Sequence, residues 1–165
     1  MTSFDDYVQT HLPGLLRLAG VLSRDRQTSE DVVQEVLFRA SKRWDQIGEA
    51  GAPDAYVRRM VVNEYLSWRR KWARIIPHAV IDTGAVTPDH AQELTERDEM
   101  AARLQALPAR QRAVLVLRYY EGLSDEQTAD VLDCSHGAVR TAASRALASL
   151  RVTAEAELLL DGKGQ

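Results

Sequence analysis

The stretch from Leu123 to Leu150, LSDEQTADVLDCSHGAVRTAASRALASL, is the feature that most constrains the fold. Ser124 is a good N-cap residue, and Gln127 three positions later completes a capping box, which fixes the start of a short helix. Ser135 follows the Asp133-Cys134 break as a second N-cap, and nothing after it interrupts a helix until past Leu150. The pattern therefore predicts two helices joined by a three-residue turn.

The second of these helices has an apolar side and a basic side. At about 100° per residue, one narrow stripe carries Val139, Ala143, Ala146 and Leu150. The residues that point away from the stripe are Gly137, Arg140, Thr141, Ser144, Arg145 and Arg151. Small residues between arginines suit a helix that lies in a DNA major groove, so the stretch predicts a DNA-reading helix-turn-helix. An ordinary helical hairpin with a solvated polar face is the alternative.

A basic helix is predicted from Pro53 to about Arg74, because proline suits a first helical turn. Its apolar arc carries Val57, Val61, Tyr65, Trp68 and Trp72, and we expect both tryptophans in the core. The opposite arc holds Arg59, Asn63, Ser67, Arg70 and Arg74, and Arg58 and Arg69 flank the boundary. Arginines can bind phosphates and an asparagine can hydrogen-bond to a base edge, so this face predicts nucleic-acid contact. A solvated basic helix is the alternative.

Two further helices are predicted before Pro53. The first runs from Asp5 to about Ser23, and we expect Pro13 to kink or divide it. The second is expected to start near Thr28 or Ser29 and to continue towards Trp44. Gly48 and Gly51 then mark a loop.

The chain as a whole is predicted to be all-α, with two small helical domains joined by a flexible linker. The first domain covers residues 1–74, the linker 75–92, the second domain 93–160, and a frayed tail 161–165. In the second domain the helical pattern resumes with Leu94, and Pro108 separates that helix from one that continues to Gly122.

The charge of the chain is small but strongly segregated. A net charge of −3 is low for a protein that binds DNA by charge alone, because nonspecific affinity comes mainly from phosphate neutralisation. Basic residues crowd between positions 58 and 74, and acidic residues crowd between 82 and 99. A chain divided in this way is expected to rely on a partner for much of its DNA affinity.

Residue types for catalysis or metal binding show no suitable arrangement. The single cysteine, Cys134, and the four histidines have no ligand-like spacing, so we expect no metal or other cofactor. No paired carboxylates, activated nucleophile or glycine-rich phosphate loop is evident, so we expect that the protein is not an enzyme. The start, MTSFDDYVQTHLPG, is unlike a signal peptide, and no transmembrane run is present, which predicts a cytoplasmic protein.

With both helical blocks in view, the chain resembles a group IV sigma-70 family factor, the extracytoplasmic function (ECF) type, over nearly its full length. TSEDVVQEVLFRASKRW resembles the polymerase-binding helix of that family, and PDAYVRRMVVNEYLSWRRK resembles its −10 recognition and melting segment. LPARQRAVLVLRYYEGLSDEQTADVLDCSHGAVRTAASRALASLR resembles its −35-binding domain. The run YVRRMVVNEYLSWRR is especially similar to the actinobacterial SigE-like subfamily.

The resemblance implies a factor that binds core RNA polymerase, recognises −35 and −10 promoter elements and stabilises the melted −10 strand. Its implied partners are the β′ clamp helices and β flap of polymerase and promoter DNA. The resemblance leaves open whether an anti-sigma factor is a further partner. It places core binding at Asp31, Gln34 and Glu35; −10 contact at Arg58, Arg59, Asn63, Ser67, Arg69, Arg70 and Arg74; and −35 contact at Ser135, His136, Gly137, Arg140, Thr141, Ser144 and Arg145. The segment from Gln46 to Ala52 is expected as a loop that receives a flipped base.

Two departures from the family pattern concern the second domain. Asp133 stands where the turn usually has glycine, and aspartate tolerates the left-handed conformation better than most residues. Ala138, Ala142 and Ala143 replace side chains that are often longer, so we expect the −35 interaction to be weak. A stand-alone helix-turn-helix regulator and a helical adaptor without DNA binding remain the alternative functions.

Overall fold

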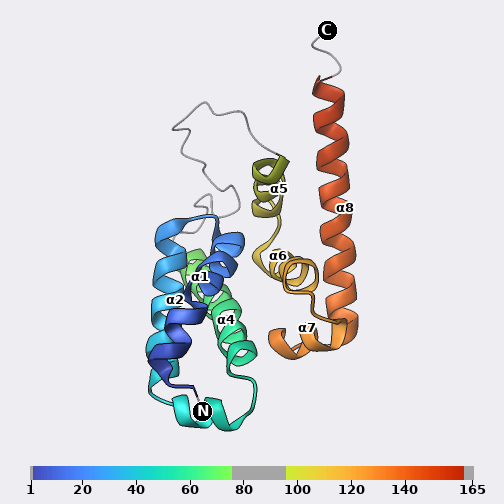
Figure 1. Cartoon of the computed structure of the whole chain (residues 1–165). Coiled ribbons are helices and arrows are strands. Elements are labelled where there is room, and N and C mark those ends of the chain that lie inside the picture. Colours follow the sequence, from blue (N-terminus) through green and yellow to red (C-terminus); the bar gives the residue numbers. More distant parts are fainter. Residues whose placement is uncertain (1, 76–95, 162–165) are drawn as a thin grey trace. The chain divides into compact units, whose positions relative to one another are not determined.

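The computed structural model describes the backbone of residues 2–75 and 96–161, and the side chains of 2–75, 98–152 and 155. All regular structure in these ranges is helical, so the predicted all-α class is confirmed (Figure 1). The chain divides into two compact units, with the division between Ala79 and Val80. The proposed linker and tail, apart from Ile75 and Asp161, lie outside the described residues, as do Leu94 and most of the acidic segment.

The described part of unit 1 contains four helices: α1 (Phe4–Ser23), α2 (Arg26–Ser41), α3 (Trp44–Glu49) and α4 (Pro53–Ile75). The three long helices α1, α2 and α4 pack against one another (Figure 1). Their apolar stripes meet in a core whose most deeply buried residues are Leu15, Leu18, Leu22, Val33, Val36, Val57, Val61, Val62 and Tyr65. This packing leaves the opposite faces of α2 and α4 exposed to solvent.

The first helix continues through Pro13 without interruption for 20 residues, so of the predicted kink or division the division is wrong. Proline removes one backbone donor, and the carbonyl that loses its partner belongs to Gln9. Gln9 and Pro13 are both exposed, so water can satisfy that carbonyl. Burial of Tyr7, Leu15 and Leu18 on the other side then holds the helix together.

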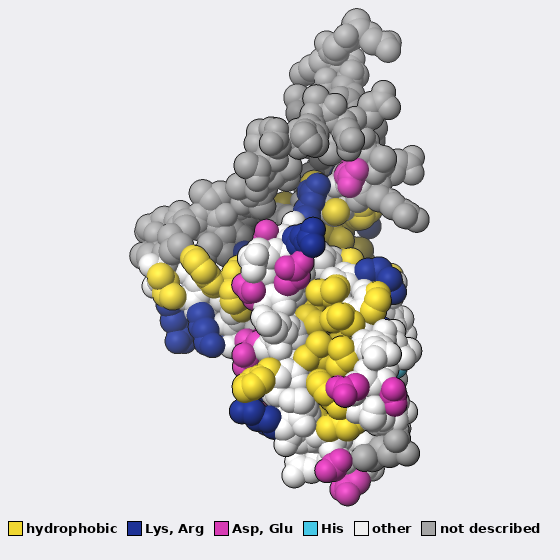
Figure 2. Space-filling view, turned by 60° about the vertical axis from the view of Figure 1, so that its left-hand side comes forward, with side chains coloured by type: hydrophobic (Ala, Val, Ile, Leu, Met, Phe, Trp, Pro, Cys, Tyr) yellow, Lys and Arg dark blue, Asp and Glu magenta, His cyan; other side chains and the backbone are white. Residues whose placement is uncertain are grey.

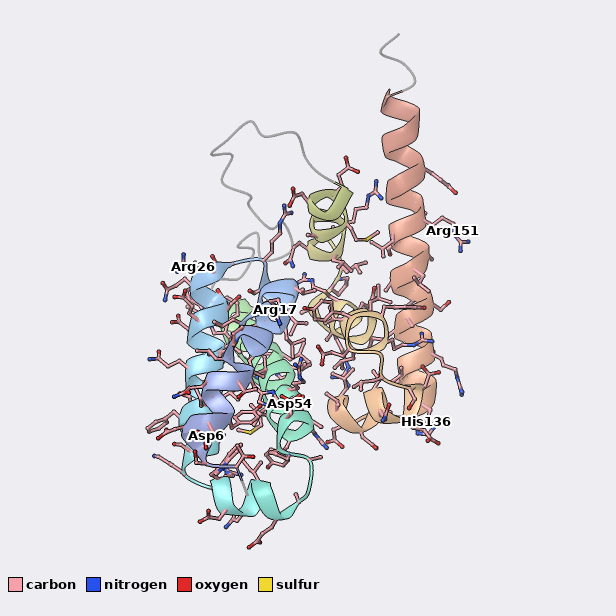
Figure 3. The ribbon with its side chains drawn as sticks, viewed as in Figure 1. Asp6, Arg17, Arg26, Asp54, His136 and Arg151 are labelled. Carbon is pink, nitrogen blue, oxygen red and sulfur yellow. The ribbon has the colours of Figure 1, made fainter. Side chains whose placement is uncertain are left out.

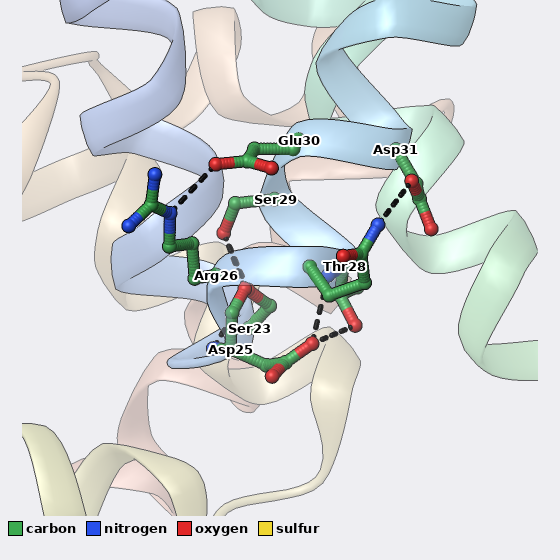
Figure 4. Close-up of polar contacts among 8 residues, drawn as sticks. Ser23, Asp25, Arg26, Thr28, Ser29, Glu30 and Asp31 are labelled. Carbon is green, nitrogen blue, oxygen red and sulfur yellow. Dashed lines mark hydrogen bonds and ion pairs between the residues drawn. The ribbon is translucent and has the colours of Figure 1, made fainter.

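The turn between α1 and α2 places the start of α2 two residues earlier than expected. Asp25 is the N-cap, and its carboxylate accepts hydrogen bonds from the backbone N–H of Thr28 at 2.7 Å and from the Thr28 hydroxyl at 2.5 Å (Figure 4). Thr28 and Ser29, expected at the start, are buried inside the first turn instead. The sequence feature that marks this start is Asp25, because an aspartate at the N-cap position accepts a hydrogen bond from a free backbone N–H of the first turn. Aspartate is preferred over threonine in that role.

A short helix occupies the segment expected as a loop. α3 includes Gln46 and Gly48, so the prediction of a loop from Gln46 to Ala52 is wrong for its first four residues. Trp44 and Ile47 are buried and fix this helix on unit 1. The Trp44 indole donates a hydrogen bond to the Thr2 carbonyl at 3.0 Å, and the centres of the Trp44 and Tyr7 rings lie 4.8 Å apart. This burial also explains why α2 ends at Ser41 rather than reaching Trp44.

The end of α4 extends past the core of unit 1. Val57, Val61 and Tyr65 are buried as predicted, but none of the side chains from 67 to 75 is buried. Trp68 is half-buried and Trp72 is 41% exposed, so the expectation that both tryptophans lie in the core is wrong. The amphipathic pattern continues beyond the length of the partner helices, and periodicity alone does not show where the partners stop.

Unit 2 contains α5 (Glu96–Gln105), α6 (Ala109–Leu115), a π-helical turn η1 (Val116–Tyr120), α7 (Asp125–Leu132) and α8 (His136–Asp161). α8 packs against α6 and α7. The buried Arg112 joins α6 to the end of α5, because its guanidinium donates hydrogen bonds to the carbonyls of Leu104, Gln105 and Leu107 at 2.8–2.9 Å. The sequence predicted a single regular helix up to Gly122 and gave no sign of the π turn or of this buried cation.

The predicted helix-turn-helix is confirmed in detail. Ser124 and Gln127 form the capping box of α7, with reciprocal hydrogen bonds of 3.1 and 2.9 Å. Asp133 adopts the left-handed conformation, with φ 51° and ψ 57°. Ser135 caps α8 by accepting from the Ala138 N–H at 3.1 Å. The turn between the helices is therefore Asp133 to Ser135, as local sequence chemistry indicated.

Candidate functional site

A pocket of about 500 Å³ lies between α2 and α4 on the surface of unit 1. Its lining residues are Arg39, Tyr56, Arg59, Met60, Asn63, Glu64 and Ser67. Three residues predicted from the basic arc, Arg59, Asn63 and Ser67, are thus brought together around one cavity. An aromatic ring, a thioether, an amide and two guanidiniums are groups that can stack on and hydrogen-bond to an unstacked base.

Four lining residues were missed by the sequence analysis. Tyr56, Met60 and Glu64 occur at helical spacing from Arg59, Asn63 and Ser67, so they lie on the same face of α4 and the pattern could have indicated them. Arg39 comes from α2, and no local pattern could place it there. The segment from Gln46 to Ala52 contributes no lining residue to this pocket.

Arg39 is shared between two carboxylates. Its guanidinium forms an ion pair with Glu64 across the pocket, from α2 to α4. Its Nε lies 3.4 Å from the carboxylate of Glu35, one helical turn earlier on α2. The Glu64 side chain is 17% exposed and the Glu35 side chain 51% exposed, so the Glu64 contact is the better shielded from solvent.

The outer face of α2 carries the residues predicted for polymerase binding. Asp31, Gln34 and Glu35 are all exposed, and Asp31 accepts a hydrogen bond from Gln27 at 2.9 Å (Figure 4). Phe38 lies on the same face and is 57% exposed, with the Lys42 ammonium 4.1 Å from its ring centre. Figure 2 shows hydrophobic and acidic side chains lying beside one another on one face of the molecule. An exposed aromatic residue is typical of a protein-binding surface, and charged residues are common at the polar rim around such a residue.

Arg58 is drawn away from the pocket by a cluster at the start of α4. Its Nε lies 2.8 Å from Asp54, which also accepts hydrogen bonds from the Tyr7 hydroxyl at 3.1 Å and contacts His11 Nδ1 at 3.1 Å. Figure 3 shows Asp54 within unit 1 near α1. Burial, and then the Asp54 charge, raise the pKa of Tyr7. Through Asp54, Arg58 therefore helps to fix α1 on α4.

The basic residues at the end of α4 continue beyond the pocket. Arg70 and Arg74 are exposed and Arg69 is half-buried. On the opposite arc of the helix Tyr65, Trp68 and Trp72 form a run of rings, with centres 6.5 and 5.6 Å apart, of which Tyr65 is buried. The basic arc of this half of the helix thus presents guanidiniums to solvent, which suits the phosphates of a single-stranded nucleic acid.

The candidate reading face of unit 2 is on α8. Val139, Ala143 and Ala146 are buried, whereas Arg140, Thr141, Ser144 and Arg145 are exposed, as the stripe predicted. His136 and Gly137 are exposed at the N-terminal end, and Ser135 is occupied as the cap (Figure 3). Ala143 faces the core, so its small size removes no contact from the reading face. Ala138 is exposed and does leave that face short of a long side chain.

No group of three or more histidine, cysteine or acidic side chains is placed to hold a metal ion within the described residues. Within the same part of the chain, no helix is long and apolar enough to cross a membrane.

Comparison with known proteins identifies both units. The family model for Sigma-70 region 2 matches residues 7–75, and that for Sigma-70, region 4 matches residues 97–150. The chain is 36% identical to the RNA polymerase sigma-E factor of Streptomyces avermitilis, over 90% of this chain and 83% of that protein. It is 32% identical to the ECF RNA polymerase sigma factor SigL of Mycobacterium tuberculosis, over 87% and 84%.

A solved structure supports the same assignment. The sigma factor RpoE of Bartonella quintana, crystallised with the anti-sigma factor NepR, superposes with a TM-score of 0.72 at 26% identity, over 92% of this chain and 96% of that one. Two matched regions, relatives matched over more than four fifths of their length and a shared fold agree. The chain therefore belongs to the sigma-70 family of RNA polymerase sigma factors, in its extracytoplasmic function group, and its role is promoter-specific transcription initiation.

Proposed function

We propose that unit 1 binds core RNA polymerase through the outer face of α2 and holds the melted −10 strand in and around the α2–α4 pocket. The observation that carries this proposal is the pocket itself, which gathers Arg59, Asn63 and Ser67 with Tyr56. Unstacking a base costs a few kcal/mol, so a cavity that offers stacking and hydrogen bonds can hold an open strand. Arg69, Arg70 and Arg74 then carry the flanking phosphates, and Arg58 supports the start of the helix.

Unit 2 places α8 at the −35 element. Arg140, Thr141, Ser144 and Arg145 contact bases or phosphates, and the His136–Gly137 end approaches the backbone of the DNA. With few long side chains on this face, unit 2 serves as an anchor, and core polymerase supplies the remaining affinity through Asp31, Gln34 and Glu35 and through the β flap. The domains proposed for these tasks are residues 1–74 and 93–160, and the factor works in the cytoplasm, on the nucleoid, by binding energy and without catalysis.

An anti-sigma factor is a third partner that we infer for this chain. Support comes from the Bartonella quintana relative, which was solved in complex with one. Purification of the chain from its own cells, followed by identification of a bound protein that blocks core binding, tests this partner.

Transcription in vitro with purified Streptomyces core polymerase tests the main proposal. Promoter-dependent RNA is expected only when the protein is added, and absence of core binding would overturn the proposal. Asn63→Ala is expected to lower open-complex formation about tenfold and to leave core binding unchanged. Arg140→Ala should weaken duplex −35 binding instead. Equal losses of core binding and opening in the Asn63 variant would count against the assignment of the pocket.

A further inference from the structure

The ion pairs of Arg39 connect two surfaces with different proposed partners. On one side lies Glu35, on the outer face of α2, and on the other lies Glu64, in the wall of the pocket. The Arg39 guanidinium is thus shared by two carboxylates. The Glu35 side chain is about half exposed, whereas the Glu64 side chain is largely shielded from solvent. A partner that binds the Glu35 carboxylate therefore reduces the negative charge that neutralises the Arg39 guanidinium.

We propose that Arg39 is a −10 strand contact of the pocket, neutralised in the free protein by Glu35 and Glu64, and that core polymerase strengthens this contact by taking Glu35. The proposal rests on the proposed function, because it takes α2 as the polymerase-binding face and the pocket as the site of the strand. It adds an arginine from the polymerase-binding helix to the proposed −10 contacts, which otherwise come from α4 alone.

Charge within the pocket supports this role. The lining contains two guanidiniums, Arg39 and Arg59, and one carboxylate, Glu64. In the free protein both acids lie on Arg39, so the pocket offers little net attraction to an anionic strand. When a cationic group of the polymerase binds Glu35, Arg39 keeps one acid instead of two, and its outward N–H groups become stronger phosphate donors.

Binding of a fluorescein-labelled, mixed-sequence single-stranded 15-mer to the full chain, measured by anisotropy across a salt series, tests the contact. Arg39→Ala is expected to weaken binding roughly three- to tenfold and to lower the slope of log K against log salt by about 0.7, the amount for one lost phosphate contact. Arg26→Ala is the matched control, since Arg26 forms a similar pair with Glu30 on the same helix, away from the pocket. An unchanged slope for Arg39→Ala overturns the proposal.

Removal of the other partner separates DNA contact from a merely structural pair. Arg39→Ala and Glu64→Gln break the same ion pair, so a structural role predicts weaker binding in both. The proposal predicts opposite signs: Glu64→Gln tightens binding about two- to threefold, and this gain shrinks when Arg39 is also alanine. A gain of equal size in both backgrounds overturns the role of Arg39, because Glu64 would then act by its own charge.

The link to polymerase is tested on the outer face of α2. Glu35→Gln removes the negative charge of that carboxylate, as binding to a cationic group of the polymerase would. It is expected to tighten single-strand binding about twofold, which is the size expected for an exposed ion pair one helical turn apart. Asp31→Asn removes the same charge from the same face without touching Arg39 and should change binding less. Equal effects overturn the link. If wild-type protein supports promoter-dependent transcription while these results fail, the sigma function stands and only this inference is lost.

Discussion

The hydroxyl of Tyr7 on α1 lies 3.1 Å from Oδ1 of Asp54 on α4 and donates a hydrogen bond to it. Tyr7 is 2% exposed, and its ring also stacks on His11. Burial and the neighbouring carboxylate both disfavour the phenolate, which is why the pKa of Tyr7 is raised. The contact fixes the N-terminal helix to the helix that carries the pocket.

Unit 1 should lose stability at high pH because of this tyrosine. In the unfolded chain Tyr7 ionises near pH 10, while in the fold it stays protonated to higher pH. The stabilisation is complete below about pH 10 and falls above it, by up to about 1.4 kcal/mol per pH unit. All three tryptophans lie in unit 1, so tryptophan fluorescence during urea unfolding at pH 8 to 11 measures this loss. Tyr7→Phe should flatten the decline; a slope identical to that of the wild type would contradict the account.

Replacement of Arg112 should unfold unit 2 more readily than any surface change. Its buried guanidinium donates to three carbonyls at and just after the end of α5. Arg112→Met removes all three of these hydrogen bonds, and the Leu104 carbonyl keeps only the backbone N–H of Leu107. We expect a loss of about 2–4 kcal/mol, measured by circular dichroism during urea unfolding. Arg110→Met is the control, because exposed Arg110 donates to one carbonyl among the described residues, that of Leu132, and its replacement should cost less than about 1 kcal/mol.

The turn of the helix-turn-helix should tolerate glycine better than its own residue. Asp133 has φ 51°, a conformation that costs an L-residue free energy and costs glycine none. Asp133→Gly is therefore expected to stabilise unit 2 by about 0.5–1 kcal/mol, and Asp133→Val to destabilise it by at least about 1 kcal/mol. Thermal unfolding of both variants gives the comparison, and destabilisation by glycine would show that the aspartate carboxylate contributes more than the backbone strain.

Phe38 should be a main anchor for core polymerase. It is 57% exposed on the face that carries Asp31 and Glu35, and exposed aromatic residues often dominate binding energy at interfaces. Phe38→Ala is expected to raise the Kd for core polymerase about tenfold or more. Phe38→Leu keeps apolar surface and should lose less. Single-strand DNA binding by the free protein should not change in either variant, and a parallel loss there would indicate damage to α2 itself.

Local chemistry predicted the parts of this fold that depend on neighbouring residues. The capping box at Ser124, the left-handed turn at Asp133 and the buried stripe of α8 all follow from residues within a few positions of one another. The start of α4 at Pro53 is another example.

Contacts between distant segments could not be predicted in this way. Arg39 meets Glu64 across 25 positions of sequence, so the periodicity of either helix is silent about the pair. The burial of Trp44, which turns an expected loop into α3, depends on Tyr7 and Thr2. The burial of Arg112 likewise depends on carbonyls at and just after the end of α5, and an arginine is ordinarily expected at the surface. The periodicity of the segment also did not indicate the π turn.

The end of α4 has a further consequence for how such a chain can evolve. From Ser67 to Ile75 no side chain is buried, so substitutions there remove no packed core and cost little folding free energy. Mutations at Arg70 or Arg74, two of the proposed −10 contacts, are therefore not eliminated for loss of stability. If these residues contact the −10 strand as proposed, duplicated copies of the gene can change this segment while unit 1 keeps the same interior.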